Sequence, residues 1–180
     1  GGGNKIILTF DDCGYPPEET VQILNILAQY GAKAIFFPTG ACVKQYPEIF
    51  NRVIAEGHLI GNHTYDHPDL TSLSVEQVRW QIANGPAQAN GGYWRPPYGA
   101  HNKTIDQIAR ELGYTLMLWD IDTRDWARRY PGGDQEILNI VLSQAFPGAI
   151  VLMHVHVPNT MKVLPTIIEQ LQAKGYIISW

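Results

Sequence analysis

The stretch KIILTFDD, residues 5–12, joins a nearly continuous apolar run to two adjacent carboxylates, Asp11 and Asp12. Apolar residues that follow one another, instead of alternating with polar ones, indicate a strand buried on both faces, as in a parallel sheet. Two neighbouring carboxylates at the end of such a strand repel each other and need a cation or an arginine. Adjacent side chains on a strand point to opposite faces of the sheet, so one carboxylate can face a metal ion while the other has a different role. The plainer alternative is a solvated turn that caps the next helix.

Beyond this stretch, short β-rich runs alternate with amphipathic segments along the chain. The predicted strands are Lys5–Phe10, Lys33–Pro38, His58–Asn62, Tyr93–Arg95, Tyr114–Trp119, Ala149–His154 and Tyr176–Ser179. Capping signals mark several helices, such as Ser74 followed by Gln77. The predicted helices are Glu18–Tyr30, Lys44–Glu56, Val75–Asn90, Lys103–Leu112, Gln135–Ala145 and a last helix that begins near Val163–Pro165.

This alternation, repeated six times and closed by a final strand, predicts a parallel α/β fold with right-handed crossovers. Seven strands could form an open doubly wound sheet or an incomplete barrel, and the pattern alone does not choose between the two. The chain has 180 residues, of which 45% are apolar and 17% are charged. This length and composition predict one globular domain, residues 1–180, with a real core.

The charge and apolar runs exclude two classes of partner. The net charge is −4, and the densest basic stretch, Arg124 to Arg129, is short. Nucleic-acid binding calls for a basic face, so we expect no such partner. No apolar run reaches the roughly 18 residues of a membrane span, and residues 1–180 show no signal-peptide pattern. Because the sequence opens with Gly1-Gly2-Gly3, we interpret it as a processed or truncated form.

Polar and ionisable residues collect just after the predicted strands. In parallel α/β folds the carboxyl ends of the strands meet on one face, where active sites lie. Residues scattered along most of the chain should therefore converge in space. The groups in question are Asp11-Asp12, His63 to His67, Arg95 to Tyr98, Asp120 to Trp126, and His154 to His156.

His63 and His67 are four residues apart, a common spacing for two imidazoles that reach one cation. The alternative is a pair of loop histidines that hydrogen-bond the backbone. Two imidazoles and one carboxylate form a hydrolytic metal site with an open position for water. Zinc is the default ion for such ligands, and cobalt, nickel or iron would also fit.

Three further residues are candidates for catalysis. Arg95 is a natural partner for a carboxylate such as Asp11, unless it is a surface arginine beside a rigid turn. His154 ends an apolar strand, where a histidine is more often a core residue than a catalyst, but its position at the active face favours catalysis. His156 projects to the same side of that strand and competes with His154 for the role.

These residues, in this order, resemble the NodB-homology polysaccharide deacetylases, also called carbohydrate esterase family four. The resemblance extends from Thr9 to about Trp180 and rests on five motifs in matched order. They are TFDD (residues 9–12), HTYDH (63–67), RPPYG (95–99), DTRDW (122–126) and LMH (152–154). The resemblance implies a distorted (β/α) barrel of about seven parallel strands with a groove for a sugar polymer.

Carried onto matching positions, the resemblance implies that Asp12, His63 and His67 bind one divalent metal ion. Asp11 would be the general base, held by Arg95.

The same resemblance implies that His154 is the general acid, tuned by Asp125, and that the amide of Tyr98 helps to hold the oxyanion. The implied substrate contacts are Trp126, Leu152 and Pro97.

The implied activity is removal of N-acetyl groups from N-acetylglucosamine polymers, chitin or peptidoglycan, by a secreted or cell-wall enzyme that we expect to be monomeric. One alternative is an acetylxylan esterase with the same site. Another is a carbohydrate-binding protein that has lost catalysis, which the complete set of site residues argues against. A metal-dependent phosphoesterase would need ligands for a second metal and a phosphate-binding glycine loop, and neither is evident.

The sequence departs from the family pattern in two places. Cys13-Gly14 follows TFDD where Gly-Pro is frequent, and Val155 with His156 follows the last motif where an acidic residue is common. Cys13 and Cys42 follow the first two predicted strands, which are expected neighbours, so a disulfide between them is one interpretation. Two free thiols are the other.

Overall fold

A computed structural model describes residues 4–180, and the expectation about Gly1-Gly2-Gly3 lies outside this range. The fold belongs to the α/β class with a parallel sheet, as predicted. Hydrogen bonds define the strand order β3-β2-β1-β7-β6, with β8 also paired to β1, and a separate pair β4-β5. The strands are β1 (Lys5–Asp11), β2 (Ile35–Phe37), β3 (Leu59–Ile60), β4 (Tyr93–Trp94), β5 (Thr115–Leu116), β6 (Ile121–Asp122), β7 (Ile150–His154) and β8 (Ile177–Ile178).

The helices connect these strands as the alternation predicted. They are α1 (Glu18–Gln29), α2 (Gly40–Gln45), α3 (Pro47–Ala55), α4 (Val75–Ala83), α5 (Lys103–Glu111), α6 (Gly133–Gln144) and α7 (Pro158–Ala173). Short 3-10 turns lie at Leu70–Ser72, Pro97–Gly99 and Asp125–Ala127. Within residues 4–180, none of these helices combines the length and apolar character that crossing a membrane requires.

Strand β1 lies beside β7 in parallel register from Ile7↔Ile150 to Asp11↔His154, so the two strands end at the same level. The side chains of Leu8, Thr9 and Phe10 are fully buried, and successive strand residues point to opposite faces, which confirms that this run forms a strand covered on both faces. The register therefore brings two predicted site residues, Asp11 and His154, to one edge of the sheet.

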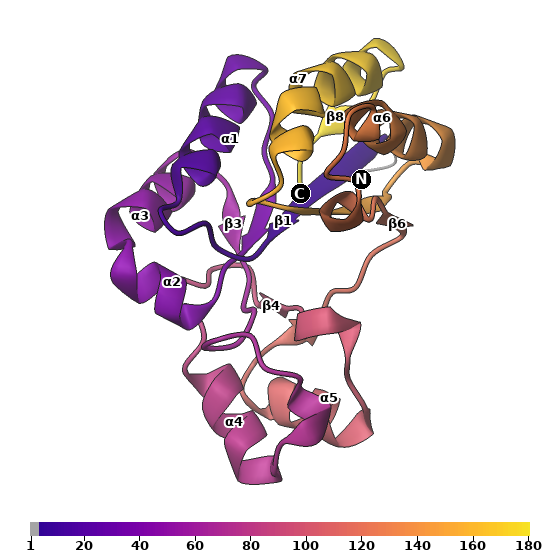
Figure 1. Ribbon diagram of the computed structural model, residues 1–180. Coiled ribbons are helices and arrows are strands. Elements are labelled where there is room, and N and C mark those ends of the chain that lie inside the picture. Colours follow the sequence, from indigo (N-terminus) through magenta and orange to yellow (C-terminus); the bar gives the residue numbers. More distant parts are fainter. Residues whose placement is uncertain (1–3) are drawn as a thin grey trace. The chain divides into compact units, whose positions relative to one another are not determined.

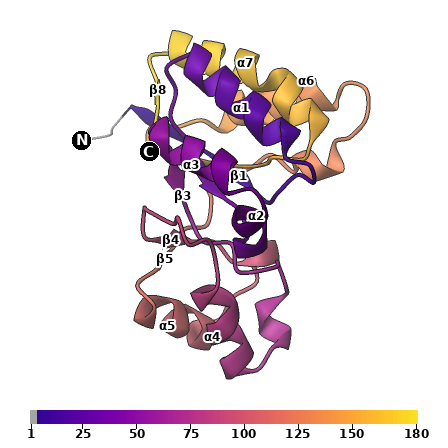
Figure 2. The same ribbon diagram turned by 90° about the vertical axis from the view of Figure 1, so that its left-hand side faces the viewer.

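The chain divides into two compact units. The first unit contains the described residues up to Ile35, Glu56–His58 and Trp119–Trp180, and the second contains Phe36–Ala55 and Leu59–Leu118. In the first unit, α1 and α6 pack against α7 (Figure 1). In the second unit, α4 and α5 lie side by side (Figure 2). The core between α4 and α5 includes Val78, Ile82 and Ile105, with Trp94 from β4.

Several predicted elements end differently in the structure. The predicted helix Lys44–Glu56 is two helices, α2 and α3, because a proline at position 47 lacks the N–H that a continuous helix needs there. The last helix begins at Pro158, well before Val163, and carries Pro165 inside it. Strand β6 was not predicted, because two residues carry too little periodic signal. The capping box of Ser74 and Gln77 is present as predicted.

Cys13 lies just beyond β1, with Asp12 between them, and Cys42 lies in α2. Neither is a free thiol in the structure. The single catalytic domain over residues 1–180 and the closure of the sheet into a barrel stay predictions.

Candidate active site

The buried carboxylate of Asp125, in the first unit, accepts hydrogen bonds at both of its oxygens. Its Oδ1 lies 2.7 Å from Nδ1 of His154 and accepts the Trp126 N–H at 2.9 Å. Its Oδ2 accepts the His154 N–H at 2.8 Å and the Thr160 hydroxyl at 2.6 Å. Four donors thus fix this carboxylate, which in turn fixes the imidazole of His154 at the end of β7.

The charge of His154 is set by two opposing effects. Burial disfavours the imidazolium, but the hydrogen bond to Asp125 and its negative charge act in the other direction, and the charges of Asp11 and Asp12 add to them. Together the carboxylates raise the pKa of His154 from 6.5 to about 9. Because Nδ1 is engaged with Asp125, Nε2 is the atom that can pass a proton to another group.

The adjacent carboxylates Asp11 and Asp12 lie in different backbone conformations. Asp11 ends β1, is only 4% exposed, and is the register partner of His154. Asp12 comes next with φ of 79°, in the left-handed region that non-glycine residues rarely adopt. Such backbone strain persists only where surrounding structure imposes it, and it is concentrated at functional sites.

In the second unit, the His63 ring is buried and oriented by the backbone. Its Nδ1 lies 2.7 Å from the carbonyl oxygen of Arg95, which can only accept, so Nδ1 carries the hydrogen. Nε2 is then the nitrogen that can bind a cation, and a carbonyl behind a histidine ligand is the usual way to fix its orientation.

The turn from residue 62 to residue 67 presents His67 beside His63, with ring centroids 4.9 Å apart. Both Thr64 and His67 have positive φ, and the Thr64 hydroxyl accepts the His67 N–H at 3.1 Å. The buried Asn62 side chain accepts the Thr64 N–H and donates to the carbonyl of residue 82. Asn62 in turn needs a glycine at position 85, where a Cβ would lie 2.2 Å from its side-chain oxygen.

Arg95 is fully buried in the second unit, contrary to the alternative of a surface arginine. Its Nε donates to the carbonyl of Met117 at 3.0 Å, and Nη2 donates to that of Leu118 at 2.8 Å. Its Cζ lies 4.4 Å from the centre of the Phe37 ring. A buried guanidinium held this firmly is suited to fixing a carboxylate.

The predicted substrate contacts differ in exposure. Tyr98 is 73% exposed with φ of 62°, and Pro97 before it is buried. Trp126 is half exposed, with the Arg124 guanidinium 5.4 Å from its ring centre, whereas Leu152 is only 5% exposed. Tyr98 and Trp126 therefore offer surface to a ligand.

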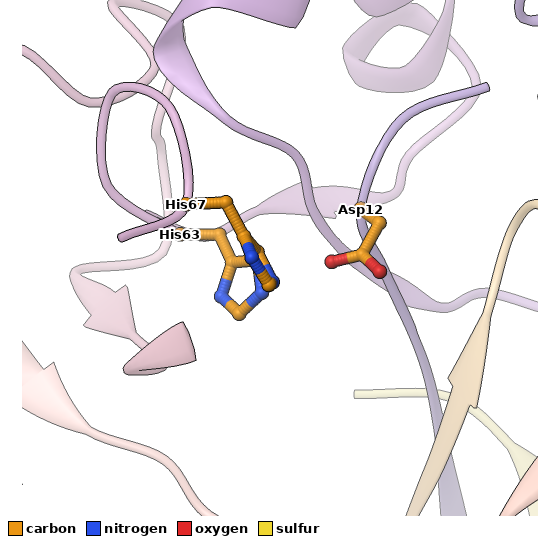
Figure 3. A group of neighbouring side chains, drawn as sticks. All are labelled: Asp12, His63 and His67. Atoms are coloured by element: carbon orange, nitrogen blue, oxygen red, sulfur yellow. The ribbon is translucent and has the colours of Figure 1, made fainter. Parts of the chain in front are cut away.

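The three predicted metal ligands form the candidate metal centre. Asp12, His63 and His67 each offer one ligand atom, and these atoms lie within 4.8 Å of one another (Figure 3). Two imidazole nitrogens and one carboxylate oxygen fit a divalent transition-metal ion and leave coordination positions open.

The sequence missed several supporting residues and one contact. Thr160, Asn62 and Arg129 had no functional role in the sequence interpretation, because none of them lies within the five motifs. His156 was expected to compete with His154, but its Nε2 lies 2.8 Å from Oδ2 of Asp12, whereas His154 is bound to Asp125.

A parallel α/β fold with an Asp/His/His cluster and a buried carboxylate–imidazole pair is typical of metal-dependent hydrolases. Residues 1–117 match the family described as polysaccharide deacetylase. The chain is 39% identical to the peptidoglycan-N-acetylglucosamine deacetylase PgdA of Listeria monocytogenes over 178 residues, 96% of this chain and 37% of that protein. It is 38% identical to a chitooligosaccharide deacetylase of Rhizobium leguminosarum over 193 residues, 96% of this chain and 87% of that protein.

Among solved structures, a family 4 carbohydrate esterase from Streptomyces lividans in complex with acetate has a TM-score of 0.88 and 31% sequence identity. That likeness covers 98% of this chain and 92% of the other. The chain therefore belongs to the polysaccharide deacetylase family, as the motifs predicted. It spans little more than a third of the length of the Listeria relative.

Proposed function

We propose that this chain removes N-acetyl groups from N-acetylglucosamine polymers, peptidoglycan or chitooligosaccharides, with one divalent metal ion held by Asp12, His63 and His67. The observation that carries the proposal is the cluster of these three ligand atoms within 4.8 Å. Zinc is the proposed ion because two imidazoles and one carboxylate match its usual hydrolytic ligand set. Cobalt, nickel and iron are the competing ions.

The ligand residues fit this ion in their surroundings as well as in their chemistry. The Arg95 carbonyl fixes the His63 ring so that Nε2 is the binding atom, and Thr64 fixes the backbone of His67. The chemistry that a bound divalent ion supplies is Lewis-acid polarisation of the acetyl carbonyl and activation of water.

Asp11 is the proposed general base, which takes a proton from the attacking water on a carboxylate oxygen. Its burial at the end of β1 and its register opposite His154 support this role. The buried guanidinium of Arg95 is its proposed partner and would orient the carboxylate.

His154 is the proposed general acid, which gives the Nε2 proton to the leaving nitrogen. An amide needs this proton because an amine anion is a very poor leaving group. The Asp125 contact supports the role because it orients the ring and keeps it protonated at neutral pH. Such a proton transfer is typically worth about 10²–10⁴ in rate.

Tyr98, Pro97, Trp126 and Leu152 are the proposed substrate contacts. The Tyr98 amide would donate to the developing oxyanion, and the positive φ at Tyr98 marks a backbone held in a defined orientation. The ring of Trp126 and the side chains of Leu152 and Pro97 would enclose the acetyl methyl group.

An acetylxylan esterase would use the same residues, since an ester and an amide need the same attack on a carbonyl. Because the relatives named above include enzymes of peptidoglycan and chitooligosaccharides, we propose the amide substrates and a secreted or cell-wall location.

The test is product analysis on chitooligosaccharides, peptidoglycan and acetylated xylan, with and without a chelator. Release of acetate from the first two, lost with chelator and restored by zinc, is the expected result. Acetate release from xylan alone would shift the assignment to the esterase, and activity undiminished after verified metal removal would refute the metal-dependent mechanism.

A further inference from the structure

A chain of two hydrogen bonds leads to Asp12 from the segment after β7. The Nε2 of His156 lies 2.8 Å from Oδ2 of Asp12. On the other side of the same ring, Nη2 of Arg129 lies 2.9 Å from Nδ1, and Nη1 of Arg129 donates to the His156 carbonyl at 3.3 Å. Arg129 therefore contacts both the ring and the backbone of His156.

The chemistry of the partners fixes the direction of both bonds. A guanidinium has only donors, so Nδ1 of His156 accepts from Arg129 and carries no hydrogen. The hydrogen of the neutral ring is then on Nε2, which donates to the Asp12 carboxylate.

We propose that Arg129 and His156 are positioning residues for the metal centre, which orient Asp12 through its Oδ2 so that its other oxygen faces the cation. This inference rests on the proposed role of Asp12 as a metal ligand. A carboxylate held at one oxygen loses the rotation that would otherwise spread its second oxygen over many positions. Hydrogen-bonded partners of metal ligands act in this way and raise metal affinity.

The residues around Arg129 and His156 hold both of them in a fixed position. Val155 and Val157, on either side of His156, are buried and anchor its backbone. The loop that carries Arg129 is fixed because the Asn159 side chain donates to the carbonyls of Arg128 and Tyr130, at 2.7 and 3.1 Å. The imidazole is thus held on two sides by protein groups.

The proposed role of His156 accounts for one of the two departures from the family pattern. Val155 with His156 stands where an acidic residue is common after the last motif. The ring of His156 lies 5.7 Å from that of His154 between centroids, yet the two rings bind different carboxylates. His154 belongs with Asp125 and proton transfer, whereas His156 belongs with Asp12 and the metal.

The experiment measures zinc affinity of the chelator-treated protein by competition with a chromophoric chelator. His156→Leu removes the donor and should weaken zinc binding by about 10–100-fold. His156→Gln places an amide N–H near the position of Nε2 and should restore most of that loss, whereas His156→Asn, with a shorter side chain, should not. Arg129→Met keeps the imidazole but removes the donor that fixes its tautomer, and we expect zinc affinity to fall several-fold.

His101→Leu is the matched control, because His101 contacts Asp106 within the second unit. Its zinc affinity should equal that of the wild type. Unfolding of each metal-free variant, followed by circular dichroism, shows whether the fold is intact, and the Co²⁺ absorption spectrum of His156→Leu should differ from that of the wild type.

Wild-type zinc affinity in both His156→Leu and Arg129→Met would overturn the positioning role, as would equal losses in His156→Leu and His156→Gln. His67→Ala separates this result from failure of the proposed function. If His67→Ala loses zinc and His156→Leu does not, only the positioning role is wrong. If His67→Ala binds zinc as the wild type does, the proposed metal centre itself is wrong.

Discussion

Asp125 holds His154 at two atoms, since its Oδ2 accepts the backbone N–H and its Oδ1 lies 2.7 Å from the ring Nδ1. One carboxylate thus fixes both the position and the orientation of the imidazole. It also supplies the negative charge that most strongly opposes the effect of burial on the imidazolium.

Asp125→Asn should therefore lower both the pKa of His154 and the rate of deacetylation. The variant keeps the shape of the side chain but removes its charge, so the pKa should fall from about 9 toward 6.5. Loss of the acid at neutral pH should reduce kcat by about 10²–10⁴. NMR titration of the imidazole in the metal-free protein measures the first effect, and acetate release measures the second. A His154 that still titrates near 9 in this variant would show that Asp125 is not the cause.

The stability of the metal-free protein should fall as the pH rises through the pKa of His154. The folded pKa of about 9 lies above the ordinary value of 6.5, so the folded state binds the proton more tightly than the unfolded state does. The stabilisation is fully present below about pH 6.5 and is lost progressively up to about pH 9. Denaturant unfolding of the wild type at several pH values should show this decline, and His154→Gln should flatten it. The facing ionisable groups are Asp125, Asp11, Asp12 and the nearby His156.

Thr160→Val should destabilise the fold although no motif includes this residue. Its hydroxyl donates to the buried Asp125 carboxylate at 2.6 Å, and valine leaves that acceptor with one donor fewer. Loss of a hydrogen bond to a buried charged group costs about 1–3 kcal/mol in the free energy of unfolding. The exposed Thr104→Val is the control, with an expected change within about 0.5 kcal/mol. Equal stabilities of the two variants in urea would contradict the argument.

The sequence predicted the parallel α/β class because a strand covered on both faces leaves a continuous apolar run, as in β1 and β7. The same reasoning placed Asp11 and His154 at one edge of the sheet, where the register now puts them. It did not predict β6, which has two residues, or the start of the last helix, where Pro158 takes a first-turn position that was given to Pro165.

Some residues of the candidate site could be predicted from the sequence pattern, whereas others are identified only by their contacts in the folded chain. The spacing of His63 and His67 and the adjacent carboxylates are visible in the sequence, and the ligand atoms lie together. The partner of His156 is not visible, because its contact with Asp12 joins residues far apart in the chain through the packing of β1 against β7. Thr160 and Asn62 were missed because their partners Asp125 and Ile82 lie far from them along the chain.

Asp11→Asn and His67→Ala should distinguish loss of the general base from loss of the metal ion. Asparagine cannot take a proton from water, so Asp11→Asn should retain zinc and lose about 10²–10⁴ in kcat. His67→Ala removes a proposed ligand and should lose both zinc and activity. Metal analysis of the purified variants, alongside acetate release from a chitooligosaccharide, measures both effects. Near-wild-type turnover of Asp11→Asn would remove Asp11 from the base role, and full zinc content in His67→Ala would remove His67 from the ligand set.

Cys13 and Cys42 should form a disulfide, since neither is a free thiol in the structure and they are the only two cysteines of the chain. The bond would close a loop of about 30 residues and stabilise the fold by roughly 3–4 kcal/mol, through loss of conformational freedom in the unfolded chain. Intact mass without reductant should be two hydrogens below the mass after reduction, and reduction should lower the midpoint of denaturant unfolding. The double variant Cys13→Ala/Cys42→Ala is the control, because reductant should leave its unfolding unchanged. An identical mass before and after reduction would show two thiols and would contradict this prediction.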